Sequence, residues 1–217
     1  MCDRLLVSGN YNKRGVAIRM PCWVRWYLSG GFILSAAPRL SWVPRAEATP
    51  TVAEIYDRYM RTRANVPNMF RTMAHRPEIF ETMIAHFEAI LRTGTVPLRL
   101  KELVIVRTLQ LNRCEYCLGS HTQIALRLGW SREQLENLTH YADRRDFTAA
   151  EKAALRLAEQ MTLDANHIPD EEFEALREYF DEGEIVELMA AIGLFNYFNR
   201  VNNALQIEPT KPGEGAE

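Results

Sequence analysis

Residues 102–121 read ELVIVRTLQLNRCEYCLGSH and join an apolar segment to two cysteines and a histidine. Apolar side chains in the first half recur at helical spacing, which predicts a helix over residues 97–111 that opens at a proline. Asn112 and Arg113 interrupt the pattern. A second helix is predicted over residues 114–128, so the cysteines lie at or near its start.

Cys114, Cys117 and His121 are spaced i, i+3 and i+7 and share one face of that second helix. The partial positive charge and free N–H groups of a helix N-terminus favour thiolate, the nucleophilic form of cysteine. His121 can accept or donate a proton nearby. Proximity to the helix start favours Cys114 as the nucleophile, whereas proximity to His121 favours Cys117. The residues alone leave both assignments open.

Other interpretations of these residues exist. The two cysteines could be inert core residues, since free cysteine is commonly buried. Cys114, Cys117 and His121 could also be three zinc ligands, although no fourth ligand is evident nearby. Glu102 is either a solvated surface residue or, if it is buried beside the thiols, a proton carrier.

The chain from about residue 50 onward alternates amphipathic helices with short loops, and no strand alternation is evident. Ser131 with Gln134, and Thr148 with Glu151, have the spacing of capping boxes. Asn68 is expected to cap a short helix. The predicted fold is all-α, with about eight helices. The remaining helices are expected over residues 53–63, 68–73, 77–93, 170–180 and 184–205, with two more starting at the capping boxes.

Composition excludes several classes of protein. The 217 residues carry a formal net charge of −2, with 47% hydrophobic and 25% charged residues. These are ordinary globular values, and they give no electrostatic argument for nucleic acid or an anionic membrane. No run of 18 apolar residues occurs, so a membrane-spanning helix is not expected.

The first 48 residues differ from the rest. These 48 residues carry a net charge of +5 and lack sustained helical periodicity, whereas the remainder of the chain carries a net charge of −7. We predict an irregular leader over residues 1–48, a helical domain over 49–208 and a frayed tail over 209–217. The leader faintly resembles a secretory signal, because an apolar stretch over 26–37 follows a basic start, but Gly30 and Gly31 interrupt it. A loosely ordered extension is the simpler interpretation.

The spacing of Glu102, Cys114, Cys117 and His121 resembles the alkylhydroperoxidase D and carboxymuconolactone decarboxylase family, most closely over residues 85–165. The resemblance implies an all-helical homo-oligomer, a trimer or hexamer, with thiol-dependent peroxidase or disulfide reductase activity and neither metal nor flavin. It further implies that Cys117 attacks the peroxide, Cys114 resolves the sulfenic acid into a disulfide, and Glu102 and His121 relay protons. Tyr116 departs from the pattern, because the best-known peroxidases have histidine there.

Three functions follow as hypotheses. The first is a hydroperoxidase that receives electrons from a lipoyl or thioredoxin-like dithiol and acts in antioxidant defence. The second is a lyase acting on a small carboxylated lactone, for which Glu102 and His121 would move protons; such members generally lack the cysteine pair. The third is a redox-sensing oligomer. A C-x-x-C that cycles with a cellular dithiol suits the reducing cytoplasm.

Overall fold

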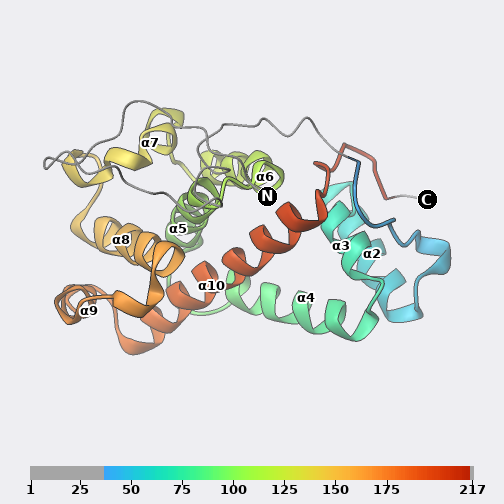
Figure 1. Cartoon of the computed structure of the whole chain (residues 1–217), viewed down its shortest axis with the longest axis horizontal. Coiled ribbons are helices and arrows are strands. Elements are labelled where there is room, and N and C mark those ends of the chain that lie inside the picture. Colours follow the sequence, from blue (N-terminus) through green and yellow to red (C-terminus); the bar gives the residue numbers. More distant parts are fainter. Residues whose placement is uncertain (1–36, 216–217) are drawn as a thin grey trace, which may run out of the picture. The chain divides into compact units, whose positions relative to one another are not determined.

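The computed structural model describes residues 37–215, which belong to one compact unit, so most of the predicted leader lies outside the described part. Within residues 37–215 the chain is helical and has no strands, which confirms the all-α prediction (Figure 1). The α-helices are α2 (Pro50–Arg63), α3 (Asn68–Met73), α4 (Pro77–Arg92), α5 (Leu98–Leu111), α6 (Glu115–Arg127), α7 (Arg132–Glu136), α8 (Ala149–Leu163), α9 (Asp170–Arg177) and α10 (Glu182–Leu205). Short 3-10 helices are η1 (Arg45–Glu47), η2 (Leu138–Asp143) and η3 (Ala165–His167).

Helix α5 is the centre of the fold and packs against α6, α8 and α10. Every residue from Lys101 to Leu109 is buried, which is typical of a helix surrounded by others rather than lying on a surface. Its apolar side chains divide among three clusters. Ile105 enters the cluster with α2, α3 and α4, Val104 the cluster with α8 and α9, and Leu103 the cluster with α6 and α7. Val104, Ile105 and Val106 are three β-branched residues in a row. The helix accommodates them because tertiary packing outweighs their low intrinsic helix propensity.

Three charged residues of α5, Lys101, Glu102 and Arg107, are buried, and each has a partner. The Lys101 ammonium is 1% exposed and donates to the backbone carbonyls of Ile90 and Thr93, both at 2.8 Å. It also lies 2.8 Å from a carboxylate oxygen of Glu187 on α10. A buried charge is tolerated when it is paired and hydrogen-bonded, so this lysine joins the end of α4 to α5 and α10.

Most of the helix boundaries follow their sequence signals. Both predicted capping boxes form, at the starts of α7 and α8. The expected cap at Asn68 is wrong, because Pro67 occupies the N-cap position and Asn68 is the first helical residue. The Asn68 side chain instead donates to the backbone carbonyl of Glu208, 3.2 Å away.

Segments at both ends of the described part contact the helical core. In the stretch before α2, the backbone N–H of Arg39 donates to the carbonyl of Leu205, and that of Val43 donates to the carbonyl of Arg71, both at 3.0 Å. Composition alone places Arg39 and Val43 in the predicted leader. Local composition does not reveal such contacts, because the partners are far away in the sequence.

The segment after α10 returns to the loop between α2 and α3. The backbone N–H of Val66 donates to the carbonyl of Glu214 at 3.0 Å, and the N–H of Asn68 donates to the Thr210 hydroxyl at 2.8 Å. Thr210 and Glu214, which lie in the segment 209–217 that is expected to fray, thus have hydrogen-bond partners in the core. No helix in residues 37–215 combines the length and hydropathy needed to cross a bilayer.

Candidate active site

The turn between α5 and α6 places the two cysteines. The N–H of Cys114 donates to the carbonyl of Leu109, and the N–H of Arg113 donates to the carbonyl of Gln110. Arg113 has a φ of 52°. This is the Schellman arrangement, with Arg113 at the left-handed position that glycine usually occupies. Only two residues therefore separate α5 from Cys114, which is the N-cap residue of α6.

The sulfur atoms of Cys114 and Cys117 are 2.8 Å apart, and both thiols are free. Two side-chain amides from α10 face the second sulfur. Asn199 Nδ2 donates to Cys117 Sγ at 3.3 Å, and Asn202 Nδ2 donates to it at 3.1 Å. The thiols and both asparagines are buried, so little water competes for these hydrogen bonds.

The thiols titrate as a pair. The hydrogen bond between them lowers the pKa of Cys114, and it raises the pKa of Cys117. Burial raises both pKa values, whereas the amides of Asn199 and Asn202 lower both. Because the two sites are coupled, the first proton leaves the pair readily and the second is retained. The reduced site is thus suited to hold a single negative charge.

Glu102 and His121 form the second pair of the site. Glu102 is 1% exposed on α5, and its Oε2 lies 2.8 Å from His121 Nδ1 on α6. The imidazole also packs edge-on against Phe195, with ring centroids 4.7 Å apart. A carboxylate at Nδ1 fixes the orientation of the ring and leaves Nε2 available for proton transfer.

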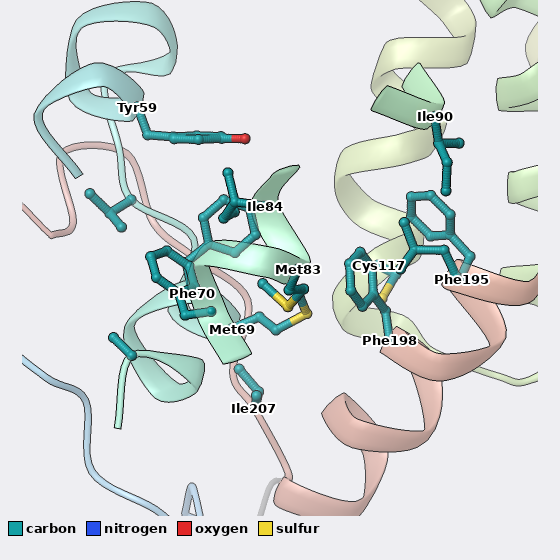
Figure 2. Packing of buried hydrophobic residues seen from close by; sticks show 14 of the residues in the cluster. Tyr59, Met69, Phe70, Met83, Ile84, Ile90, Cys117, Phe195, Phe198 and Ile207 are labelled. Atoms are coloured by element: carbon teal, nitrogen blue, oxygen red, sulfur yellow. The ribbon is translucent and has the colours of Figure 1, made fainter. Parts of the chain in front are cut away.

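A cavity of about 300 Å³ lies beside these groups. Cys117, His121 and Asn202 line it, whereas Cys114 is fully buried behind them. Figure 2 shows Cys117 next to Phe195 and Phe198, in the apolar cluster from which much of the cavity wall is built. A small molecule in this cavity can reach the sulfur of Cys117 and the imidazole, but not Cys114.

Tyr116, which departs from the family pattern, connects segments of the cavity wall through its hydroxyl group. Its hydroxyl accepts a hydrogen bond from the backbone N–H of Met69 at 3.1 Å and lies 3.4 Å from the Thr210 hydroxyl. Burial raises the pKa of the Tyr116 phenol, so the group stays neutral. Its position indicates a structural contact between α6, α3 and the C-terminal segment.

The structure brings together the four residues that the sequence singled out, in two hydrogen-bonded pairs. Within residues 37–215, no group of three His, Cys, Asp or Glu side chains is arranged to hold a metal ion, so the zinc interpretation has no support there. Sequence reasoning missed Asn199 and Asn202 as partners of Cys117. In the sequence these two asparagines stand out only as polar residues within an apolar helix. That pattern does not indicate which residue they contact.

Solved structures of similar fold include proteins with related descriptions. A peroxidase-related protein from Ralstonia eutropha JMP134, described as an alkylhydroperoxidase AhpD core, superposes with a TM-score of 0.73 at 22% identity, over 84% of this chain and 98% of that one. A peroxidase-related protein from Silicibacter sp. TM1040 superposes with a TM-score of 0.71 at 22% identity, over 85% of this chain and 100% of that one. The debrominase Bmp8 superposes with a TM-score of 0.68 at 23% identity, over 79% of this chain and 92% of that one. At such identities the likeness establishes the fold.

Sequence comparison identifies the family. The chain is 33% identical over 106 residues to the uncharacterized protein YdfG of Bacillus subtilis (strain 168), a match that covers 48% of this chain and 72% of that protein. The model of the carboxymuconolactone decarboxylase family matches residues 77–160, which include Glu102, Cys114, Cys117 and His121. The resemblance read from those residues is confirmed, and the chain belongs to the carboxymuconolactone decarboxylase family.

Proposed function

We propose that this protein is a thiol peroxidase that reduces hydrogen peroxide or organic hydroperoxides through Cys114 and Cys117. One observation carries the proposal: two free thiols lie 2.8 Å apart, and one of them lines a cavity shared with a histidine. The descriptions of structural neighbours as peroxidase-related agree with it. Cys117 is the attacking thiol in this proposal, because a substrate in the cavity can reach it and cannot reach Cys114.

The reaction has three balanced steps. The Cys117 thiolate attacks the outer oxygen of R–O–O–H, the O–O bond breaks, and R–O⁻ leaves and takes up a proton to become the alcohol. Cys117 is then a sulfenic acid. The Cys114 sulfur attacks it, a disulfide forms and water is released. An external dithiol reduces the disulfide by thiol exchange and is itself oxidised to a disulfide.

Each side group has a role in these steps. The side-chain amides of Asn199 and Asn202 stabilise negative charge on Cys117 before the attack. In the absence of substrate, Cys114 is the thiol that loses its proton more readily. The proton can shift between sulfurs that are 2.8 Å apart. His121, held by Glu102, delivers the proton to the leaving alkoxide. Such general acid catalysis contributes about 10²–10⁴-fold in known enzymes.

The partners belong to the same proposal. The reductant is a small dithiol of the lipoyl or thioredoxin-like class, the compartment is the reducing cytoplasm, and the role is antioxidant defence. The assembly is a homo-oligomer, a trimer or hexamer. Val186, 65% exposed on α10, and Leu163, 70% exposed at the end of α8, are apolar groups that such an assembly could cover. Light scattering on reduced and oxidised protein measures its size and tests whether the disulfide changes assembly, as a redox sensor requires.

The test of the function compares wild type with Cys114→Ser and Cys117→Ser. In the presence of a dithiol, wild type should consume peroxide catalytically, and without it should lose two thiols per peroxide. Cys117→Ser should be inactive. Cys114→Ser should consume one peroxide per chain and retain a sulfenic acid that dimedone traps. Full peroxidase activity in Cys117→Ser contradicts the assignment of the attacking thiol.

A second function is favoured by the hydrogen bond between Glu102 and His121 at the cavity wall. This pair could move protons at carbon, as a lyase on a small carboxylated lactone requires. The double variant Cys114→Ser/Cys117→Ser separates the two functions. Decarboxylation that survives in this variant supports the lyase, whereas loss of peroxide reduction without any lyase activity supports the thiol peroxidase.

A further inference from the structure

The cavity beside Cys117 is larger than hydrogen peroxide needs. Its volume of about 300 Å³ lies within the range of sites that bind organic ligands, whereas hydrogen peroxide has only two heavy atoms. The inference that follows rests on the proposed peroxidase function and concerns the class of peroxide that this cavity selects.

The walls of the cavity are mainly apolar and aromatic. Phe70 packs edge-on against Phe87, with ring centroids 6.2 Å apart, and Phe87 lies 6.0 Å from Phe198. These rings come from α3, α4 and α10, so three helices hold them in place. Aromatic side chains with so many neighbours form a preformed surface, which suits a flat or bulky apolar group.

A polar side chain that lines the cavity lies beside the sulfur of Cys117. The amide of Asn202 donates to Cys117 Sγ, and its oxygen Oδ1 is buried with no hydrogen-bond partner in the described part of the chain. A buried acceptor without a partner is costly unless a bound molecule supplies a donor. The O–H of a hydroperoxide is such a donor, and it belongs to the group that Cys117 attacks.

A positive charge also lines the cavity. Arg63 is the last residue of α2, its side chain is exposed, and it forms no ion pair within residues 37–215. The neighbouring Arg58 on the same helix differs, because it pairs with Glu88 at 3.1 Å. An arginine that lines a cavity without a carboxylate of its own can pair with an anionic group on a ligand.

We infer that the preferred substrate is an organic hydroperoxide with an apolar body and a carboxylate: the hydroperoxide meets Cys117 and Asn202, the body lies among the aromatic rings, and the carboxylate pairs with Arg63. The chemistry is that of the proposed function, in which the O–O bond breaks, the hydroperoxide becomes an alcohol and an external dithiol supplies two electrons. The carboxylate takes no part in bond breaking and contributes to selection.

The experiment uses two hydroperoxides of the same body. Cumene hydroperoxide is neutral, and its para-carboxylate carries the anionic group. With dithiothreitol as the reductant, wild type should show a kcat/KM about tenfold higher for the carboxylated compound, which corresponds to one charge-assisted hydrogen bond. Arg63→Gln should remove this preference and leave kcat/KM for the neutral compound within about twofold. Arg61→Gln is the matched control, since Arg61 is exposed on the same helix and does not line this cavity.

Equal kcat/KM values for the two compounds in wild type overturn the inference, as does an equal effect of Arg63→Gln on both. The peroxidase proposal survives that outcome, because the neutral compound is still reduced. If neither compound is reduced, binding of the unreactive alcohol 4-(2-hydroxypropan-2-yl)benzoate decides the matter. Calorimetry should then show binding to wild type and to Arg61→Gln that is lost in Arg63→Gln, and its absence from wild type contradicts the site.

Discussion

Asn202 Nδ2 lies 3.1 Å from Cys117 Sγ, although 85 residues separate the two in the chain. Asn199, one helical turn earlier on α10, donates to the same sulfur. The two amides lower the pKa values of both thiols. Helix α10 therefore adjusts the pKa values of two cysteines that lie at the start of α6.

Replacing both asparagines tests this tuning. Asn199→Leu/Asn202→Leu should raise the first pKa of the thiol pair, because the donors that stabilise the thiolate are lost. The rate of reaction with peroxide near neutral pH should fall by about tenfold or more, since less thiolate is present. Thiolate absorbance at 240 nm against pH measures the shift. Asn137→Ala, which replaces the half-buried C-cap residue of α7, is the control and should leave the titration unchanged.

The stability of the reduced protein should depend on pH through the same pair. The pKa of Cys114 is lowered, so between that value and about 8.5 the unfolded chain keeps a proton that the native state has lost, and stability rises with pH. The pKa of Cys117 is raised, so above about 8.5 the unfolded chain loses a proton that the native state keeps, and stability falls.

The contribution of the pair should therefore be greatest near pH 8.5, the ordinary value for a thiol. Urea unfolding of reduced and oxidised protein at several pH values measures it. The oxidised form is an internal control, because a disulfide has no proton to lose and the other groups titrate similarly in both forms. A difference between the two forms that does not change with pH contradicts the coupled titration.

Glu102→Gln should lower peroxide turnover while the fold is retained. The amide keeps the size of the side chain but does not carry the charge that orients and supports the proton on His121. We expect kcat to fall by about 10–100-fold, with two reactive thiols remaining. Glu136→Gln, on the exposed face of α7, should have no effect. Unchanged kcat in Glu102→Gln excludes this carboxylate from the proton relay.

Lys101→Met should destabilise the protein strongly. The change leaves the Ile90 and Thr93 carbonyls without their donor and removes the cation beside Glu187. Breaking a buried charge pair by removing one partner costs about 3–5 kcal/mol. Denaturant unfolding measures this cost, and Lys211→Met, in which an exposed lysine is replaced, is the control.

The same variant should alter the response to acid. Burial acts to raise the pKa of Glu187, but hydrogen bonds from Lys101 and from two backbone N–H groups lower it overall. A lowered pKa contributes stability above about pH 4.3, the ordinary glutamate value, and this contribution is lost as the pH falls through the folded-state pKa. Lys101→Met should therefore lose less stability than wild type between about pH 5 and pH 3.

Tyr116→Phe should reduce stability without changing the chemistry at sulfur. The Met69 N–H loses its acceptor, and a buried donor left unsatisfied costs about 1–3 kcal/mol. The pH dependence of thiol reactivity should match wild type, because the phenol stays neutral and is not the proton carrier. A shift in that pH profile would show that the Tyr116 hydroxyl acts on the thiols.

The sequence was sufficient for local features. Helical periodicity, prolines and capping boxes gave most of the helices between residues 50 and 205. Cys114, Cys117 and His121 shared a face because their spacing matches one helix, and the spacing of Glu102 from the cysteines identified the family. The cap at Asn68 could not be read correctly, since its side chain bonds to Glu208, 140 residues away.

The relationships between distant helices were decided by tertiary packing. Periodicity shows that α5 is apolar, but only the arrangement of its neighbours buries Glu102 against His121 and gives Lys101 three partners. Packing of α10 against α5 and α6 brings two asparagines to the sulfur of Cys117. Side-chain hydrogen bonds act over about 3 Å, so a pattern along the chain cannot specify a partner on another helix until the core has set the distance between them.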